Sequence, residues 1–408
     1  MSTIMDGLST IDDLDVDSRR VLLRTDFNVP LTSASAGPPV TVADDARIRA
    51  ALPTIEELLR RGARLVLVSH VDQLTGVQDD ASMRPVAERL AELTGADVPL
   101  APGVTGPAVR ELTERLAPGA MLMLENVRFA AGETRNDPRF AAELAELADV
   151  YVDDAFGSAD RAHASTEAVA HLLPCAAGRL MEREILAVSA IVDQPARPLV
   201  AILGGAGLRD QIGLVRRFLD LADVVCVGGV MGLSFLCVLG HSIGSLRPPP
   251  DSEQARLSLD SAWQAGRLEV PADLLLRAGE ALTGNQSPTW PRRQVTDEQA
   301  AFDIGPETAE RYAAEIGAAA TVFWSGSMGR TELAAFAGGT RTIAEALAST
   351  SATTVVGGWD TVEAMRAYGL QDRVSHLSTG GGATLKLLEG RELPGLQALR
   401  GSSRGNGQ

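Results

Sequence analysis

Short apolar runs alternate with amphipathic stretches along the whole chain. Continuous runs of Val, Leu and Ile are typical of strands buried on both faces of a sheet. Strands separated by helical stretches predict an α/β protein with mostly parallel sheets and helices on both faces. The expected strands are 20–24, 64–69, 121–124 and 150–153 in the first half, and 199–203, 224–227, 321–324 and 354–356 in the second.

The stretch 45–61 has the pattern of an amphipathic helix. Asp45 is suited to cap its beginning and Gly62 to end it. Pro53 lies inside the pattern and predicts that the helix is split or kinked there. The apolar positions recur at spacings of three and four residues: Ile48, Leu52, Ile55 and Leu59.

Two α/β halves flank a long helical stretch at 180–193, and 408 residues exceed one typical core, so we predict two domains. Residues 33–39 read as a small loop and 285–299 as an exposed polar excursion. The tail 401–408 is expected to be disordered.

The net charge of −16 argues against nonspecific binding to nucleic acid or to an anionic membrane. Three cysteines are too few for a disulfide framework, and no run reaches transmembrane length. The first residues are acidic and lack the apolar segment of a signal peptide. We therefore expect a cytoplasmic protein with reduced thiols.

Seven motifs in order together resemble the phosphoglycerate kinase family. The resemblance implies two Rossmann-like domains with parallel sheets in a bilobal architecture. It also implies that the two domains close about a hinge and that the protein is a monomer. It assigns 1–178 to a phosphoglycerate-type substrate domain, 179–195 to a connecting helix, 196–390 to a nucleotide-type domain, and 391–408 to a segment returning to the first domain. The motifs are Arg24–Pro30, Ser69–His70, Leu124–Phe129, Asp154–Gly157, Arg161–Ser165, Asp303–Pro306 and Ser378–Ala383.

By motif match, the first domain carries a patch that binds a small anionic substrate. Arginine suits this role because its planar fork binds phosphate or carboxylate oxygens and stays charged. Arg47 resembles the arginine that stabilises the transferring phosphoryl group. The implied substrate-binding residues are Arg24, Asp26, Asn28, His70, Arg128 and Arg161.

The patch departs from the family pattern at three positions. The family's Leu-Gly-Arg-Pro after the histidine is Val-Asp-Gln-Leu here, so Gln73 replaces a phosphate-binding arginine and Asp72 introduces a carboxylate. Asp160 replaces a histidine. Because two added carboxylates repel phosphate, we expect a ligand that differs from 3-phosphoglycerate, with an amine or one anionic group fewer.

The nucleotide half of the resemblance implies Mg²⁺ with ATP or ADP. Asp360 resembles the magnesium-linked carboxylate, and glycines 380–382 form a helix N-terminus suited to an anion and to catalysis. The other implied nucleotide-binding residues are Gly205, Gly229, Glu332 and Thr361.

This half departs further from the family than the first. Gly207 and Gln211 stand in place of two lysines, and the positioned cations of phosphoryl transfer are worth about 10³–10⁵ in rate. Val230 and Trp359 replace glycines, and we expect the indole to obstruct phosphate or to form a new wall. Arg209 is the candidate catalytic replacement for the lost lysines, and Lys386, the one lysine of the chain, is the second candidate.

Three functions remain open on this reading. The first is a phosphoglycerate kinase with a rewired site. The second is an enzyme of a specialised pathway that transfers phosphoryl or acyl groups at another carboxylate, with an unknown acyl acceptor and weakened or lost ATP-dependent activity. The eroded nucleotide half favours this second function, or the third, over the first. The third is a ligand-binding protein without catalysis.

Overall fold

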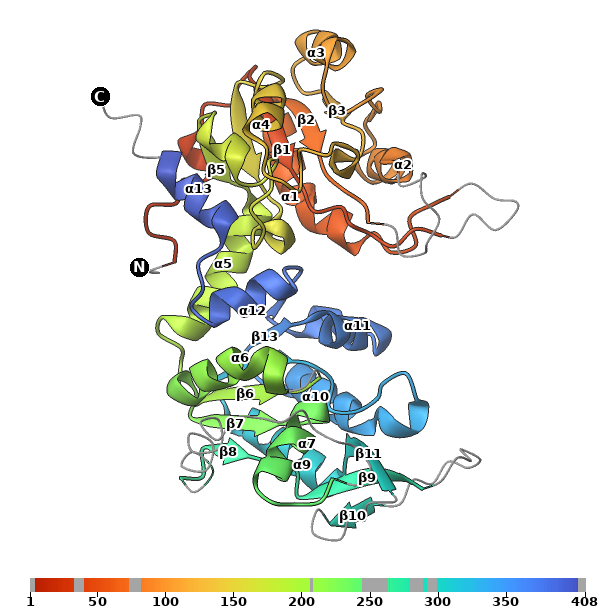
Figure 1. The fold of residues 1–408 in the computed structure, drawn as a ribbon, viewed down its shortest axis with the longest axis vertical. Helices are drawn as coiled ribbons and strands as arrows, with labels where there is room; N and C mark the ends of the chain where they lie inside the picture. Colours follow the sequence, from red (N-terminus) through yellow and green to blue (C-terminus); the bar gives the residue numbers. More distant parts are fainter. Residues whose placement is uncertain are drawn as a thin grey trace. The chain divides into compact units, whose positions relative to one another are not determined.

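The computed structural model describes residues 4–32, 40–72, 82–205, 208–243, 263, 265–278, 289–291 and 299–402 (Figure 1). The predicted loop 33–39 and most of the predicted excursion 285–299 lie outside these ranges. The chain divides into two compact units. Unit 1 comprises 1–186 together with 392–408, and unit 2 comprises 187–391.

Unit 1 is built on a five-stranded parallel sheet with the strand order β3-β2-β1-β4-β5. Every predicted strand of the first half forms, because these apolar runs are buried on both faces. The strands are β1 (Arg20–Arg24), β2 (Arg64–Val68), β3 (Met121–Met123), β4 (Val150–Asp153) and β5 (Cys175–Ala177). The helices are α1 (Ala46–Arg60), α2 (Arg84–Thr94), α3 (Pro107–Glu114) and α4 (Pro138–Ala145). Helix α5 (Arg179–Val192) begins in unit 1 and ends in unit 2, because the boundary follows Leu186.

Helix α1 corrects two details of the sequence prediction. Pro53 lies inside one continuous helix, so the predicted break does not divide it. Asp45 precedes the helix, but its carboxylate makes no capping hydrogen bond and accepts instead from Arg49 and Arg89. Gly62 does mark the end, because it adopts φ 78° and its N–H donates to the carbonyl of Leu59.

Unit 2 contains a six-stranded parallel sheet of order β14-β13-β12-β6-β7-β8 and a three-stranded antiparallel sheet of order β10-β9-β11. The four strands expected from apolar runs form the centre of the large sheet. Its strands are β6 (Leu199–Leu203), β7 (Val224–Val227), β8 (Leu268–Glu269), β12 (Thr321–Ser325), β13 (Thr353–Gly357) and β14 (His376–Leu377). The small sheet contains β9 (Asp273–Ala278), β10 (Thr289–Pro291) and β11 (Gln299–Ile304).

The helices of unit 2 cover its large sheet. Two of them, α7 and α11, also contribute to the pocket described below. They are α6 (Leu208–Leu221), α7 (Gly229–Val238), α9 (Pro306–Ala318), α10 (Gly338–Ser349), α11 (Trp359–Ala367) and α12 (Gly382–Leu388). The sheet and helices enclose a core that includes Trp324 and Tyr312, both almost completely buried. No helix in the described ranges is long and apolar enough to cross a membrane.

Helix α13 (Pro394–Ser402) belongs to unit 1 although it follows unit 2 in the sequence. It packs against β5, and the N–H of Gly395 donates to the carbonyl of Ala159 at 3.0 Å. Arg400 donates to the carbonyl of Ile4. Gly401 and Ser402, which were expected to belong to a disordered tail, are helical. The rest of the predicted tail, 403–408, lies outside the described residues.

Two adjacent carboxyl groups are buried where β4 ends. Burial raises the pKa of Asp153 to about 7 and that of Asp154 to about 6. Asp154 accepts hydrogen bonds from the N–H groups of Leu180 and Met181, so it holds the first turn of α5. Asp153 accepts from the N–H of Ala155 at 2.9 Å.

These raised pKa values predict that unit 1 loses stability as pH rises from about 4 to about 7. The native state binds more protons than the unfolded chain in this range, so the free energy of unfolding falls with increasing pH. Asp153→Asn should remove on the order of 2–4 kcal/mol of this fall. Urea unfolding between pH 4.5 and 8 measures it.

Asp149→Asn is the matched control, because Asp149 directly precedes the same strand, β4. Hydrogen bonds from Arg20 lower the pKa of Asp149, so this substitution should cost stability at neutral pH and not at acid pH. If Asp153→Asn left the pH dependence unchanged, the Asp153 carboxyl would not titrate in this window.

Candidate active site

Polar side chains gather at the carboxyl edge of the unit 1 sheet. Arg24 ends β1 in register with Val68 on β2 and with Asp153 on β4. His70 and Asp72 follow β2, and Asp26 and Asn28 follow β1. This edge is where ligands bind in open parallel sheets, because the loops that leave the strands converge there.

Arg24 is completely buried and is held on all sides. Its Nε donates to the Ser165 hydroxyl at 2.8 Å, and its Nη1 donates to the carbonyl of Thr25. Ser165 in turn donates to the buried carboxylate of Glu133 at 2.7 Å. The guanidinium is therefore fixed by a buried polar network that compensates its loss of hydration.

His70 is buried beside Arg24. Burial and the charge of Arg24 lower the pKa of His70 well below its usual range, so the imidazole is neutral. Arg24 Nη2 lies 3.1 Å from His70 Nδ1. Because a guanidinium only donates, Nδ1 accepts and the ring proton is on Nε2, which lies 3.9 Å from an Asp72 oxygen.

Asp26 and Arg47 form an ion pair at 2.8 Å. Burial raises the pKa of Asp26, but the charges of Arg47 and Arg24 outweigh that effect and keep the pKa below its usual value. Asn28 donates its N–H to Asp26 at 3.2 Å. Arg47 projects from the first turn of α1, so its position depends on where that helix begins.

Asp72 hydrogen bonds with two residues of the predicted patch, Arg128 and Asn28. Its carboxylate accepts from Arg128 at 2.9 Å and from the Asn28 amide at 3.1 Å. Its N–H donates to the Asn28 side-chain oxygen at 2.9 Å, so Asp72 and Asn28 are doubly bonded to each other. Arg128 is oriented from η2 (Val127–Phe129), which Asn126 caps.

Arg161 is the last arginine of the predicted substrate patch in unit 1. Its Nε lies 3.6 Å from Asp160, and its side chain is half exposed. The charges of Arg128 and Arg161 both contribute to lowering the pKa of His70, after burial and Arg24. The structure thus brings together all seven residues predicted in this unit. The sequence analysis did not assign Ser165 and Glu133, although Ser165 lies within a quoted motif.

Unit 2 contains a pocket of about 440 Å³. Its walls come from the start of α7, from β11, from the loop after β12 and from the start of α11. Four predicted nucleotide-binding positions line it: Gly205, Gly229, Glu332 and Asp360. The fifth, Thr361, lies behind this surface, where its hydroxyl donates to the carbonyl of Gly357 and accepts from the N–H of Gly326.

The pocket requires glycine where two loops approach each other. Gly229 adopts φ 58°, which favours glycine. A Cβ at this position would lie 2.6 Å from the Ser327 carbonyl oxygen and 2.7 Å from the Gly205 nitrogen. The backbone at 205 and 229 is therefore closely packed, and this part of the pocket wall carries no side chains.

Asp360 suits the role of a magnesium-linked carboxylate. It is exposed, lies in the first turn of α11 and lines the pocket. Mg²⁺ in phosphoryl-transfer sites is held by one or two carboxylates together with substrate phosphates. The described residues contain no cluster of three or more metal-binding side chains, so a metal ion here would need the nucleotide as co-ligand.

The two bulky replacements leave the pocket open. Val230 lies on its wall with its side chain half exposed. Trp359 is half exposed at the start of α11 and is not among the lining residues. Two further wall residues were not predicted: Arg330, whose guanidinium lies 4.4 Å from the centre of the Phe302 ring, and Asp303, whose pKa burial raises to about 7.

Glycines 380–382 and Lys386 do not line this pocket. Gly380 precedes α12, and Gly381, with φ 51°, directly precedes its first residue, Gly382. Lys386 lies in the last turn of α12. Arg209 is in the first turn of α6, with its side chain outside the described part, and Gly207 lies outside the described residues.

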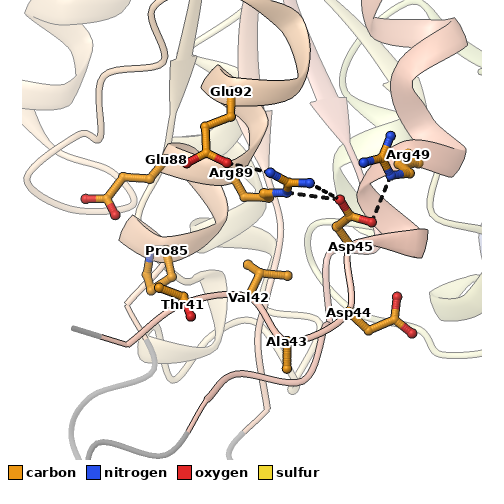
Figure 2. Close-up of a pocket in the computed structure, with 10 residues that line it drawn as sticks. All are labelled: Thr41, Val42, Ala43, Asp44, Asp45, Arg49, Pro85, Glu88, Arg89 and Glu92. Atoms are coloured by element: carbon orange, nitrogen blue, oxygen red, sulfur yellow. Dashed lines mark hydrogen bonds and ion pairs between the residues drawn. The ribbon is translucent and has the colours of Figure 1, made fainter. Parts of the chain in front are cut away.

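A second pocket, of about 680 Å³, lies in unit 1 beside α1 and α2 (Figure 2). Arg89 is already paired with Asp45 at 2.6 Å and with Glu92 at 2.5 Å, and Arg49 is paired with Asp45. Asp44 and Glu88 add further negative charge to the lining. A hollow of this charge repels anions, so it is a poor site for the predicted substrate.

The comparisons with known proteins agree with this arrangement. The family model described as phosphoglycerate kinase matches residues 11–391. Phosphoglycerate kinases of Desulforudis audaxviator and Thermomicrobium roseum are each 46% identical over 96% of this chain, covering 98% and 99% of their own lengths. The solved phosphoglycerate kinase of Coxiella burnetii has a TM-score of 0.85 at 33% identity, covering 98% of this chain and 100% of its own. The chain therefore belongs to the phosphoglycerate kinase family.

Proposed function

We propose that this protein catalyses the phosphoglycerate kinase reaction, the transfer of a phosphoryl group between ATP and the carboxylate of 3-phosphoglycerate. The observation that carries the proposal is the intact Asp26–Arg47 pair beside buried Arg24 and neutral His70. This chemistry needs positioned cations far more than covalent groups. An open pocket in unit 2, with Asp360 on its wall, supports a nucleotide partner.

Each group of the unit 1 patch has a distinct task under this proposal. Arg128 and Arg161, whose side chains are partly exposed, hold anionic groups of the substrate, and Asn28 hydrogen bonds to its hydroxyl. Buried Arg24 positions His70. Arg47 balances the negative charge that spreads over the transferring group. Mg²⁺ bound with the nucleotide at Asp360 would supply further charge neutralisation.

The relatives favour this reaction over the specialised transfer that the sequence alone favoured. Proteins 46% identical over nearly the full chain carry the name phosphoglycerate kinase. The loss of two lysines at 207 and 211 still favours a slower, ATP-dependent enzyme over a fast one. Acyl transfer without nucleotide, to an acceptor that no residue identifies, is the second candidate.

Turnover of 3-phosphoglycerate with Mg-ATP, coupled to reduction of the acyl phosphate product, tests the proposal. ADP release that requires both 3-phosphoglycerate and Mg²⁺ is the expected result. Consumption of 1,3-bisphosphoglycerate that needs an amine or thiol and no ADP would support acyl transfer instead. Binding of 3-phosphoglycerate with no turnover in either direction would support a non-catalytic binder.

Restoring the lysines should accelerate the reaction. Gly207→Lys with Gln211→Lys returns two cations to the phosphate region, and we expect ATP-dependent turnover to rise by at least about tenfold. The matched control, Ala314→Lys with Ala318→Lys, adds two cations at exposed positions of α9, where no gain is expected. A triple variant that adds Trp359→Gly tests whether the indole also slows turnover.

A further inference from the structure

The anion site of unit 1 is already occupied by an acid of the chain itself. Three cations surround His70: Arg24, Arg128 and Arg161. Each lies close enough for its charge to lower the pKa of His70, after the effect of burial. Asp26 is engaged by Arg47 at 2.8 Å. The Asp72 carboxylate accepts from Arg128 at 2.9 Å and also contacts Asn28.

Asn28 joins two halves of the site. Its backbone N–H donates to Asp26, which pairs with Arg47. Its side-chain amide donates to Asp72, which pairs with Arg128. A small substrate that places its reacting carboxylate near Arg47 would extend its other end past Asn28 toward Arg128. The Asp72 carboxylate holds the position that a second anionic group of that substrate would take.

The Asp72 side chain is exposed enough for a ligand to displace it. Its side chain is 42% exposed, so it can turn toward solvent without opening the core. A phosphate entering here must break the pair with Arg128 and then lie near a like charge. A substrate with a hydroxyl at that end meets neither cost.

We propose that Asp72 determines substrate specificity as an intramolecular competitor for the substrate's distal anionic group. It weakens binding of a carboxylate that carries a distal phosphate, and it leaves binding of the unphosphorylated hydroxy-carboxylate nearly unchanged. The proposal deepens the proposed function, on which it rests for the identity of the reacting carboxylate.

Calorimetric titration of the full chain with 3-phosphoglycerate and, separately, with glycerate tests this inference. Asp72→Gly and Asp72→Asn should each tighten 3-phosphoglycerate by on the order of 10- to 100-fold. Glycerate affinity should change by less than about threefold or stay below detection. Asp72→Asn keeps the size of the side chain, so it separates the charge from the space that Asp72 fills.

Glu114→Gln is the control, since it removes one exposed negative charge at the end of α3 in the same unit. It should alter neither affinity. Unchanged 3-phosphoglycerate affinity in both Asp72 variants, or an equal gain for the two ligands, would overturn the inference. A wild-type chain that never phosphorylates 3-phosphoglycerate, while the variants still bind it more tightly, would instead refute the proposed function alone.

Discussion

Arg47→Ala is expected to lower ATP-dependent turnover of 3-phosphoglycerate by about 10³–10⁵-fold. Arg47 is the cation beside Asp26, and the charge it contributes is needed most when the phosphoryl group is in transit. Its removal also leaves the largely buried Asp26 carboxylate without its nearest counter-charge, which raises the pKa of Asp26. Steady-state kinetics with saturating Mg-ATP measure the loss.

Arg49→Ala supplies the matched control for this prediction. Arg49 lies two residues further along α1, is exposed, and pairs with Asp45 outside the patch. It should change turnover by less than about twofold, because an exposed pair contributes little. Arg47→Lys should recover part of the activity by keeping the charge without the fork. Equal effects of Arg47→Ala and Arg49→Ala would exclude Arg47 from catalysis.

Arg24→Met is expected to reduce the free energy of unfolding of unit 1 by about 3–5 kcal/mol. Arg24 is fully buried, and its guanidinium is bonded to Ser165, Thr25 and His70. The thioether cannot replace these donors, so the Ser165 hydroxyl, the Thr25 carbonyl and His70 Nδ1 would each lose a buried hydrogen-bond partner. Urea unfolding followed by circular dichroism measures the loss.

Arg20→Met is the control, because it removes another arginine of β1 that lies outside the buried network around Arg24. Arg20 begins β1 and pairs with Asp149 at 2.7 Å near the surface. Its replacement should cost about 1 kcal/mol or less. Comparable losses for the two variants would mean that the buried network around Arg24 adds no stability beyond that of an ordinary surface pair.

Much of the fold could be predicted because the central strands are buried on both faces. Their apolar character is visible without knowledge of their neighbours, as in 199–203 and 321–324. Short edge strands such as β8 and β14, and the antiparallel sheet of unit 2, were not predicted. Their residues are less uniformly apolar, and their pairing depends on strands distant in the sequence.

The site could be predicted in outline and not in its connections. The resemblance to the family identified Arg24, Arg128 and Arg161, because each lies within one of the quoted motifs. Which acid pairs with which arginine depends on side-chain directions that no spacing encodes. The pairing of Asp72 with Arg128, and the neutral state of His70, therefore required the three-dimensional arrangement.

Trp359 shows where a substitution pattern is insufficient. A glycine replaced by an indole predicts an obstructed phosphate site, yet the side chain is half exposed and does not line the pocket. The direction in which a residue projects from the first turn of a helix depends on where that helix begins. Here α11 begins at Trp359 itself, so the side chain of its neighbour Asp360 meets the pocket.

The return of α13 to unit 1 affects the order in which the two units can fold as the protein is made. All of unit 2 has been synthesised before residues 394–402 are available to pack against β5. Domains fold as units during synthesis at about 5–20 residues per second. Unit 1 is synthesised first yet lacks α13 until all of unit 2 has been made, so the packing of unit 1 can be completed only at the end of synthesis.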